Sequence, residues 1–295
     1  MEPSLRAPIA VTALAGMLWG TSFVAMKIGL EYVDPYSFAF LRLLGGSVLS
    51  AAFMFSVERP SAALLRDRMI WVLGALNAVG FIFQNVGLTY TTATRTALIV
   101  NSNLAVTALL SWRIHHEPMG LGKLLALPSA ILGVFLLTTG GDLSTLSGGQ
   151  ATGDLLVLLA GLIWSLFIVL NKGAVSRKGS EISQIVTWVM LVTAVIIAPF
   201  TFTLGSIVRS VIPWEGWLVV AYTAVFCTFI PYLFLSKALR FVSATVSSLV
   251  LLIEVIVAIV SSALILGEQF AVGSGVGAAL VLASIILASR GSGAR

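Results

Sequence analysis

The most constraining feature of this sequence is a series of apolar runs of about 20 residues, each ended by proline, glycine or charged residues. A helix needs about 20 consecutive apolar residues to cross the hydrocarbon core of a bilayer. Runs of that kind cover residues 8–29, 36–56, 69–88, 95–114, 119–139, 153–171, 181–204, 215–235, 243–266 and 270–289. We therefore expect an all-α integral membrane protein with ten transmembrane helices.

The composition argues against the main soluble classes of protein. Of the 295 residues, 58% are hydrophobic and only 10% are charged, whereas a soluble domain carries about 25% charged residues. That much apolar surface exceeds what a single core of this size could bury. We therefore expect the lipid bilayer as a partner and expect neither a soluble enzyme, nor a nucleic-acid-binding protein, nor a disordered chain.

The distribution of basic residues predicts the orientation of the helices. If the N-terminus is cytoplasmic, the loops on that side hold all 17 lysines and arginines except Lys27, Arg42, Arg95 and Arg209. The loops on the other side carry acidic residues such as Glu31 instead. An excess of Lys and Arg in cytoplasmic loops is the usual topology signal. Both termini are therefore predicted to face the cytoplasm.

The two halves of the sequence are similar to each other. Without gaps, Gly16, Trp19 and Lys27 align on Gly161, Trp164 and Lys172. Further along, one constant offset matches Leu88, Ala93, Thr94, Leu98, Ser111, Glu117 and Gly122 with Leu239, Ala244, Thr245, Leu249, Ser262, Glu268 and Gly273. We expect two five-helix repeats at 1–140 and 153–295, joined by a polar extracytoplasmic linker at 141–152.

An odd number of helices in each half means that the second repeat enters the membrane inverted relative to the first. Inverted repeats of this kind are typical of transporters, whose similar halves can rock around a central site. A passive scaffold that arose by gene duplication is the alternative.

Short motifs are spread over nearly the whole chain. They are Gly16-x-x-Trp19-Gly20, Thr94-x-x-Ala97-Leu98-Ile99, Leu252-Ile253-Glu254 and Gly267-Glu268. Together they resemble the drug/metabolite transporter superfamily in its EamA-type branch. Val255 stands where that branch usually has proline, and His116 precedes Glu117 where it usually has glycine.

This resemblance implies a ten-helix carrier of the bacterial inner membrane with cytoplasmic termini. It also implies a central cavity lined mainly by helices 1, 3, 4, 6, 8 and 9. Bacterial members of the branch commonly export amino acids or other small metabolites. Other members of the superfamily move cationic drugs, nucleotide sugars or phosphorylated sugars.

Polar residues at mid-membrane depth are candidates for the binding site, because burying them in lipid is costly. Glu254 falls near the centre of the ninth run, where it could bind an ammonium group, carry a coupling proton or form a hydrogen bond between helices. In the third run Asn77, Phe81, and either Gln84 or Asn85 share one helix face, and Asn101 adds an amide from the fourth. Such a surface suits a zwitterionic or polar uncharged ligand, although amides also join helices by hydrogen bonds.

Aromatic residues extend this candidate site. Trp19 and Trp164 lie about midway along the first and sixth runs, where their rings either stack on a ligand or pack against other helices. The repeat makes Thr228 and Tyr232 the counterparts of Asn77 and Phe81. Beside them, Pro231 is expected to free a backbone carbonyl or to kink the helix.

The basic residues within the apolar runs are expected to have roles outside the binding site. Arg42 is expected to extend toward the membrane surface or to pair with a carboxylate. Lys27 and Arg95 are expected to anchor the outer ends of their helices. If all three converged on the cavity, an anionic substrate would become attractive.

Catalytic motifs are absent from the sequence. It has no P-loop, no Gly-x-Ser-x-Gly and no zinc motif, and the single Cys227 allows neither an intramolecular disulfide nor a thiolate cluster. We therefore predict neither an enzyme nor a cofactor or metal site.

The predicted function is a secondary transporter that exports small metabolites by alternating access around a mid-membrane cavity. Amino acids, aromatic and apolar ones in particular, are the expected substrates. The alternative substrates are cationic drugs or other metabolites, with proton coupling through Glu254, and a channel-like protein is a rival from another class. The oligomeric state is left open, and a monomer suffices for transport.

Overall fold

The computed structural model is helical in all ten predicted runs. It describes residues 6–57, 61–101, 103–139, 141, 151–177, 181–205, 211–267 and 274–290. The first half contains α1 (Arg6–Tyr32), α2 (Pro35–Val57), η1 (Ala62–Arg66), α3 (Arg68–Tyr90), α4 (Ala93–Asn101), α5 (Leu104–His115) and α6 (Leu121–Thr139). The second half contains α7 (Ala151–Arg177), α8 (Ile182–Thr203), α9 (Trp214–Ala224), η3 (Val225–Phe229), α10 (Ile230–Ala238), α11 (Ala244–Leu251), α12 (Ile253–Ser261), η4 (Ser262–Leu266) and α13 (Ser274–Arg290).

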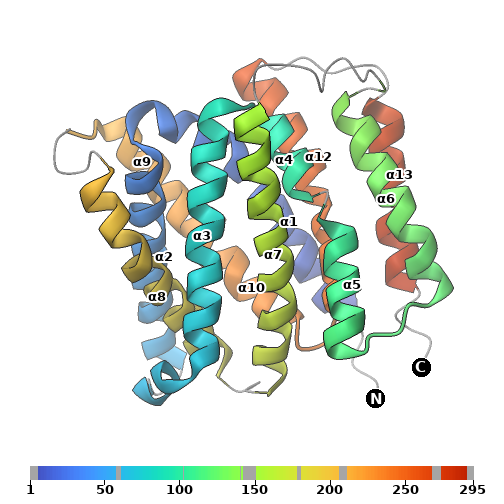
Figure 1. Ribbon diagram of the computed structural model, residues 1–295, viewed down its shortest axis with the longest axis horizontal. Helices are drawn as coiled ribbons and strands as arrows, with labels where there is room; N and C mark the ends of the chain where they lie inside the picture. Colours follow the sequence, from blue (N-terminus) through green and yellow to red (C-terminus); the bar gives the residue numbers. More distant parts are fainter. Residues whose placement is uncertain are drawn as a thin grey trace.

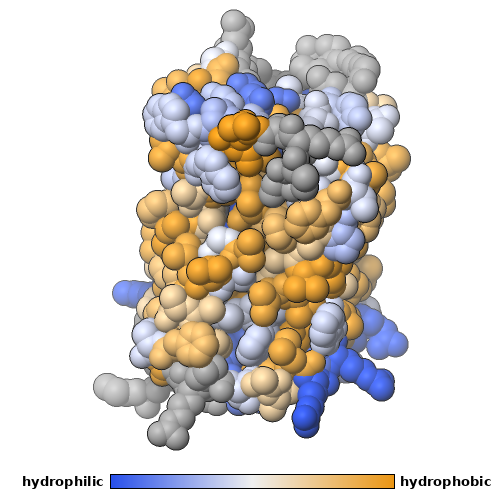
Figure 2. All heavy atoms as spheres, turned by 90° about the vertical axis from the view of Figure 1, so that its left-hand side faces the viewer, coloured by the Kyte–Doolittle hydropathy of each residue, from blue (hydrophilic) through white to orange (hydrophobic). Residues whose placement is uncertain are grey.

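The lengths and compositions of these helices make the chain a multi-pass membrane protein. Among the described residues, eight helical stretches are long and apolar enough to cross a membrane, and α6 and α13 contain shorter apolar helices. On the face that Figure 2 shows, apolar side chains form a broad band across the middle, and the most hydrophilic ones lie toward the two ends. Large side chains such as Phe55, Trp217 and Leu264 are exposed, as expected for a surface that lipid covers. The predicted fold class is confirmed.

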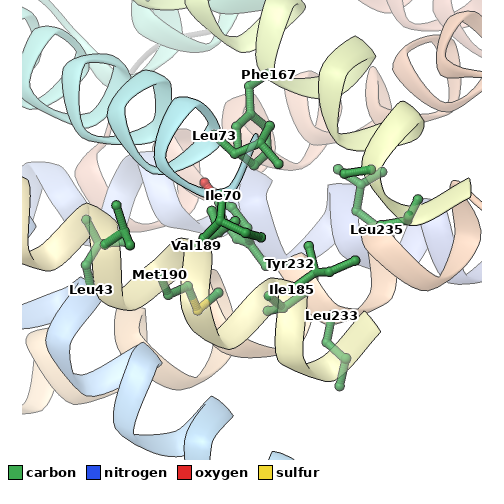
Figure 3. Close-up of a cluster of buried hydrophobic side chains, with 14 of the residues drawn as sticks. Leu43, Ile70, Leu73, Phe167, Ile185, Val189, Met190, Tyr232, Leu233 and Leu235 are labelled. Carbon is green, nitrogen blue, oxygen red and sulfur yellow. The ribbon is translucent and has the colours of Figure 1, made fainter. Parts of the chain in front are cut away.

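Helices of the two halves interlock. α1 packs on α9, α10, α11 and α12, while α7 packs in the corresponding way on α3, α4 and α5. α2 contacts α8 and α9, α3 contacts α8, and α6 lies beside α13 (Figure 1). If each helix is replaced by its counterpart in the other half, the same set of helix–helix contacts results, as a two-repeat fold requires. The largest apolar core lies where α2, α3, α7, α8 and α10 meet (Figure 3).

The fourth and ninth runs are long and apolar enough to cross a membrane, as predicted, and each consists of two successive helical segments, α4 and α5 in the first half and α11 and α12 in the second. α4 ends at Asn101, and its counterpart Leu252 separates α11 from α12. At Leu252 the turn is tight: its N–H donates to the Leu249 carbonyl (3.2 Å), and its own carbonyl accepts from the Val255 N–H (3.0 Å). The turn therefore forms with Val255, and not proline, at this point.

Glycine allows α1 and α7 to approach these breaks closely. A Cβ atom at Gly16 would lie 3.2 Å from the Leu251 carbonyl oxygen, and one at Gly161 would lie 3.0 Å from the Val100 carbonyl oxygen. Leu251 and Val100 stand at matching places just before the two breaks. The aligned glycines of the two halves are therefore explained by the same close contact of a helix with backbone.

The aligned lysines also have one structural role. The Nζ atoms donate to backbone carbonyls at the C-terminal end of the third helix of each half. The acceptors are Leu88 (3.1 Å) and Thr91 (2.8 Å) for Lys27, and Leu239 (2.5 Å) and Val242 (3.0 Å) for Lys172. A cation at this position satisfies unpaired carbonyls and interacts favourably with the helix dipole. Lys27 therefore caps the end of α3, a role that the sequence analysis did not predict.

Glu117 joins the segment before α6 to the start of α11. Its carboxylate accepts hydrogen bonds from the Ala244 N–H (2.8 Å) and from the Thr245 hydroxyl (2.9 Å), and Lys123 Nζ lies 4.0 Å away. Burial acts to raise the pKa of Glu117, but the hydrogen bonds and the ammonium group outweigh it and leave the pKa below its usual value. Its counterpart Glu268, and residues 142–150 of the predicted linker, lie outside the described residues.

Candidate functional site

A narrow cavity of about 90 Å³ lies inside the bundle at the level of the two helix breaks. Both halves contribute to it. Its lining residues are Trp19, Ser22, Phe23, Arg42, Phe81, Gln84, Val100, Asn101, Asn103, Leu104, Trp164, Phe167, Ile168, Tyr232, Leu235, Ser248, Leu251 and Glu254. The cavity therefore lies among the expected helices, with Arg42 added from α2.

One side of the cavity is an aromatic wall, which consists of Trp19, Tyr232, Phe167, Trp164 and Phe81. Successive ring centroids along this series lie 5.5, 5.8, 5.9 and 5.1 Å apart, and each ring meets the next edge to face. The indole N–H of Trp164 donates to Gln84 Oε1 (3.1 Å), and that of Trp19 donates to the Cys227 carbonyl (3.1 Å). Because each ring is held by its neighbours, the wall offers a preformed apolar surface.

Glu254 and Asn101 meet where the two broken helices face each other. Asn101 ends α4, and Glu254 lies in the first turn of α12. The Asn101 side-chain amide donates to Glu254 Oε1 (2.7 Å) and to the Ala97 carbonyl (2.9 Å). Irregular backbone at membrane depth is tolerated where it lines a cavity. This arrangement places a carboxyl group that can meet a cation or a proton next to the aromatic wall.

Arg42 lies in the cavity wall, and both parts of the prediction made for it are wrong. Its side chain is only 1% exposed, so it does not reach the membrane surface. Nε donates to Thr228 Oγ1 (2.6 Å), Nη2 donates to the Cys227 carbonyl (2.6 Å), and the guanidinium carbon lies 4.8 Å from the centre of the Phe81 ring. Within the described part of the chain, the guanidinium pairs with no carboxylate and Nη1 has no hydrogen-bond partner.

Pro231 supplies the acceptor that holds Arg42 in place. In an α-helix the N–H of residue 231 would bond to the carbonyl of Cys227, and proline has no N–H. The π-helical turn η3 surrounds this carbonyl. Both Trp19 and Arg42 donate to it. The prediction that Pro231 frees a carbonyl is confirmed.

All but two of the predicted binding residues line the cavity. Those that do are Trp19, Phe81, Gln84, Asn101, Trp164, Tyr232 and Glu254. Asn77 and Thr228 lie behind the wall. Asn77 donates to Thr193 Oγ1 (3.1 Å) and accepts from the Tyr232 hydroxyl, and Thr228 accepts from Arg42. These two side chains hold cavity residues in position, because their polar groups are already bonded to other side chains.

Sequence reasoning missed Phe167 and misjudged Arg42. Phe167 follows Trp164 by one helical turn, so the spacing alone would have placed it on the same face. Arg42 is a charged residue inside an apolar run, which by default indicates a functional site.

The other two intramembrane cations do not line the cavity. Lys27 caps α3, as described above. Arg95 forms an ion pair with Asp154 at the start of α7, and Thr91 Oγ1 donates to the same carboxylate (3.0 Å). The three cations therefore do not converge.

The chain is similar to known transporters. The model of the EamA-like transporter family matches residues 7–139 and 151–290. The uncharacterized transporter YyaM of Bacillus subtilis is 29% identical over 276 residues, which are 92% of this chain and 89% of the relative. An uncharacterized transporter of Archaeoglobus fulgidus is 26% identical over 223 residues, 75% of each chain. A crystal structure that is 15% identical has a TM-score of 0.80 and covers 96% of both chains, which supports the fold alone.

Proposed function

The chain belongs to the EamA-like transporter family, and on that premise we propose that it is a secondary transporter that exports amino acids, aromatic and other apolar ones in particular. The family and the similar proteins are transporters, so the expectation that the chain is not an enzyme is confirmed.

The observation that carries the proposal is the composition of the cavity wall. The aromatic wall suits a large apolar side chain, and a ligand ammonium can meet both the ring faces and the Glu254 carboxylate. Gln84 and Asn101 add neutral amides for polar groups of the ligand. An amino acid with an aromatic or apolar side chain satisfies all of these surfaces at once.

The proposed location is the inner membrane of a bacterium, with both termini in the cytoplasm. The excess of basic residues in loops on the terminal side supports this orientation. In Figure 1, α1 begins and α13 ends at the same end of the bundle, as an even number of crossings requires. The monomer already contains the whole cavity, so we propose that it is sufficient for transport.

The proposed mechanism is alternating access by two inverted repeats at 1–140 and 153–295, with 141–152 as the linker between them. Polar contacts between the halves occur at both ends of the bundle. Arg95 meets Asp154 at the end where α7 begins, and Glu117 meets Thr245 at the opposite end. Rocking of the halves would break one contact while the other holds.

Glu254 is the proposed proton-coupling residue. Its carboxyl group lines the cavity, so a ligand ammonium and a proton would compete for it. An exporter of cationic drugs is the alternative, and it too would use Glu254. The positive charge of Arg42 in the same cavity opposes a purely cationic ligand, so we favour amino acids.

The test is uptake of a panel of labelled amino acids into proteoliposomes, with and without a pH gradient. We expect aromatic and apolar amino acids to be transported and preloaded substrate to accelerate labelled uptake, as a carrier requires. Inactivity across the panel together with transport of cationic drugs would overturn the substrate class. Uptake without acceleration by preloading would indicate a channel.

The matched variants are Glu254→Gln and Glu31→Gln, because Glu31 is an exposed carboxylate on α1. We expect E254Q to abolish the effect of the pH gradient and to reduce transport by about tenfold or more. E31Q should change neither. Unchanged pH dependence in E254Q would remove Glu254 from the coupling.

A further inference from the structure

Arg42 carries a charge that the protein only partly satisfies. Among the described residues that line the cavity, Arg42 is the one with a positive charge and Glu254 the one with a negative charge. Nε and Nη2 of Arg42 each donate a short hydrogen bond, while Nη1 has no acceptor within the described residues. Because a buried charged donor without a partner is costly, the vacant side of the guanidinium needs an explanation.

The guanidinium is also held so that it cannot turn to another acceptor. Thr228 and the Cys227 carbonyl fix one edge from the segment that follows α9, and the Phe81 ring lies against its face. A planar guanidinium that is fixed in this way is suited to a carboxylate, which it binds through charge-assisted hydrogen bonds.

Arg42 and Glu254 do not neutralise each other. No ion pair joins them in the described part of the chain, because each is engaged elsewhere: Arg42 with the segment after α9, and Glu254 with Asn101. The cavity lining therefore contains two opposite charges, and each is held by a different part of the protein.

We infer that Arg42 binds the carboxylate of the transported molecule through Nη1, so that the cavity selects zwitterions. This inference rests on the proposed function and specifies how its substrate is recognised: the carboxylate lies at Arg42, the ammonium at Glu254 and the side chain against the aromatic wall.

A purely structural role of Arg42, as a link between α2 and the segment after α9, makes a different prediction. Removing a structural link should weaken the binding of every ligand to the same extent, because it disturbs the whole cavity wall. Removing a carboxylate-binding group weakens only ligands that have a carboxylate. Ligand preference, rather than overall activity, therefore separates the two roles.

The experiment measures binding to the full chain in lipid nanodiscs with three probes that share one indole ring. The probes are L-tryptophan, tryptamine, which lacks the carboxylate, and indole-3-propionate, which lacks the ammonium. We expect the unmodified protein to bind L-tryptophan most tightly. In Arg42→Gln, the Kd values of L-tryptophan and indole-3-propionate should rise about tenfold or more, while that of tryptamine stays within about twofold.

Further variants keep the test decisive. Arg42→Lys retains the charge without the planar fork, so it should lose part of the carboxylate preference even if R42Q does not fold. Glu254→Gln should have the opposite effect to Arg42→Gln and weaken the binding of tryptamine more than that of indole-3-propionate. Lys27→Gln removes a cation outside the cavity and should leave the order of the three probes unchanged.

The inference is overturned if R42Q weakens all three probes alike, or if the unmodified protein binds tryptamine as tightly as L-tryptophan. It is also overturned if none of the probes binds. Amino-acid transport with an unchanged carboxylate preference in R42Q would reject the inference and keep the proposed function. Arg42-dependent binding of indole-3-propionate without transport of any amino acid would reject the proposed function and keep Arg42 as a carboxylate-binding residue.

Discussion

At the scale of single residues, Pro231 shapes the cavity although its own ring does not line it. The missing N–H leaves the Cys227 carbonyl without its α-helical partner, and that carbonyl then accepts from Trp19 and Arg42. The hydrogen bonds of Trp19 and Arg42 to the Cys227 carbonyl thus depend on the absence of an N–H group at residue 231. The effect can be tested without altering any group that would touch a ligand.

We expect Pro231→Ala to supply an N–H that competes for the Cys227 carbonyl. Binding of L-tryptophan should weaken by about three- to tenfold, because Trp19 and Arg42 each lose part of a hydrogen bond. The melting temperature should stay the same or rise, because alanine favours the helix. Pro199→Ala removes a proline from inside α8 and serves as the control. A loss of stability in P231A with unchanged binding would contradict the proposed role of the freed carbonyl.

The sequence predicts depth in the membrane better than it predicts which way a side chain faces. Trp19 and Trp164 could be selected because the repeat aligns them at mid-depth, and both line the cavity. Asn77 and Thr228 lie at a similar depth, but their hydrogen bonds place them behind the wall. Arg42 was misjudged because its partners, Thr228 and Cys227, are remote in the sequence and no local pattern connects them.

At the scale of helices, the paired glycines Gly16 and Gly161 make close contacts that one added methyl group should disturb. A Cβ at Gly161 would lie 3.0 Å from the Val100 carbonyl oxygen, which belongs to a helix end and cannot move aside as a flexible side chain can. We expect Gly161→Ala to destabilise the protein by about 1–3 kcal/mol, measured as a lower melting temperature in detergent. Gly120→Ala, where nothing lies within 4 Å of the added atom, should have little effect. Equal melting temperatures of the two variants would contradict the close contact.

The ten helices could be predicted from the sequence, whereas the breaks could not. Apolar runs report length and burial in lipid, and both are properties of the local sequence. The turn at Leu252 is formed by apolar residues that are equally compatible with a continuous helix, and Val255 provides none of the signal that a proline would give. The break lies against α1 at Gly16, and this contact between segments remote in the sequence is seen only in the folded chain.

The contact that Glu117 makes with the start of α11 should make the stability of the protein depend on pH. Its pKa is lowered in the folded state, so its contribution to stability is complete above the unfolded value of about 4.3. That contribution is lost as the pH falls through the folded pKa. We expect the melting temperature to fall as the pH is lowered from about 5 to about 3, with a smaller fall in Glu117→Gln. E117Q should also be less stable at neutral pH by about 1–3 kcal/mol. An identical acid response in E117Q and the unmodified protein would rule this out.

At the scale of the whole molecule, the two halves make polar contacts at both ends of the bundle. The ion pair of Arg95 and Asp154 joins α4 to α7, and Glu117 joins the first half to the start of α11 at the other end. The cavity and its aromatic wall lie between these contacts. Weakening one contact should therefore favour opening at its own end and leave the other end closed.

We expect Asp154→Asn to open the end at which α7 begins, because it removes the charge that holds Arg95. The measurement uses Cys227→Ser with Ser22→Cys, a cavity residue, and a membrane-impermeant maleimide added from one side of oriented vesicles. D154N should raise the rate of labelling from that side by about threefold to tenfold, which corresponds to the modest energy of a partly exposed ion pair. E117Q should raise labelling from the opposite side, and Glu31→Gln, an exposed carboxylate at the same end as Asp154, should change neither rate. Because alternating access requires each contact to control one side only, equal acceleration from both sides in D154N would refute this mechanism while leaving the cavity and its ligand preference untouched.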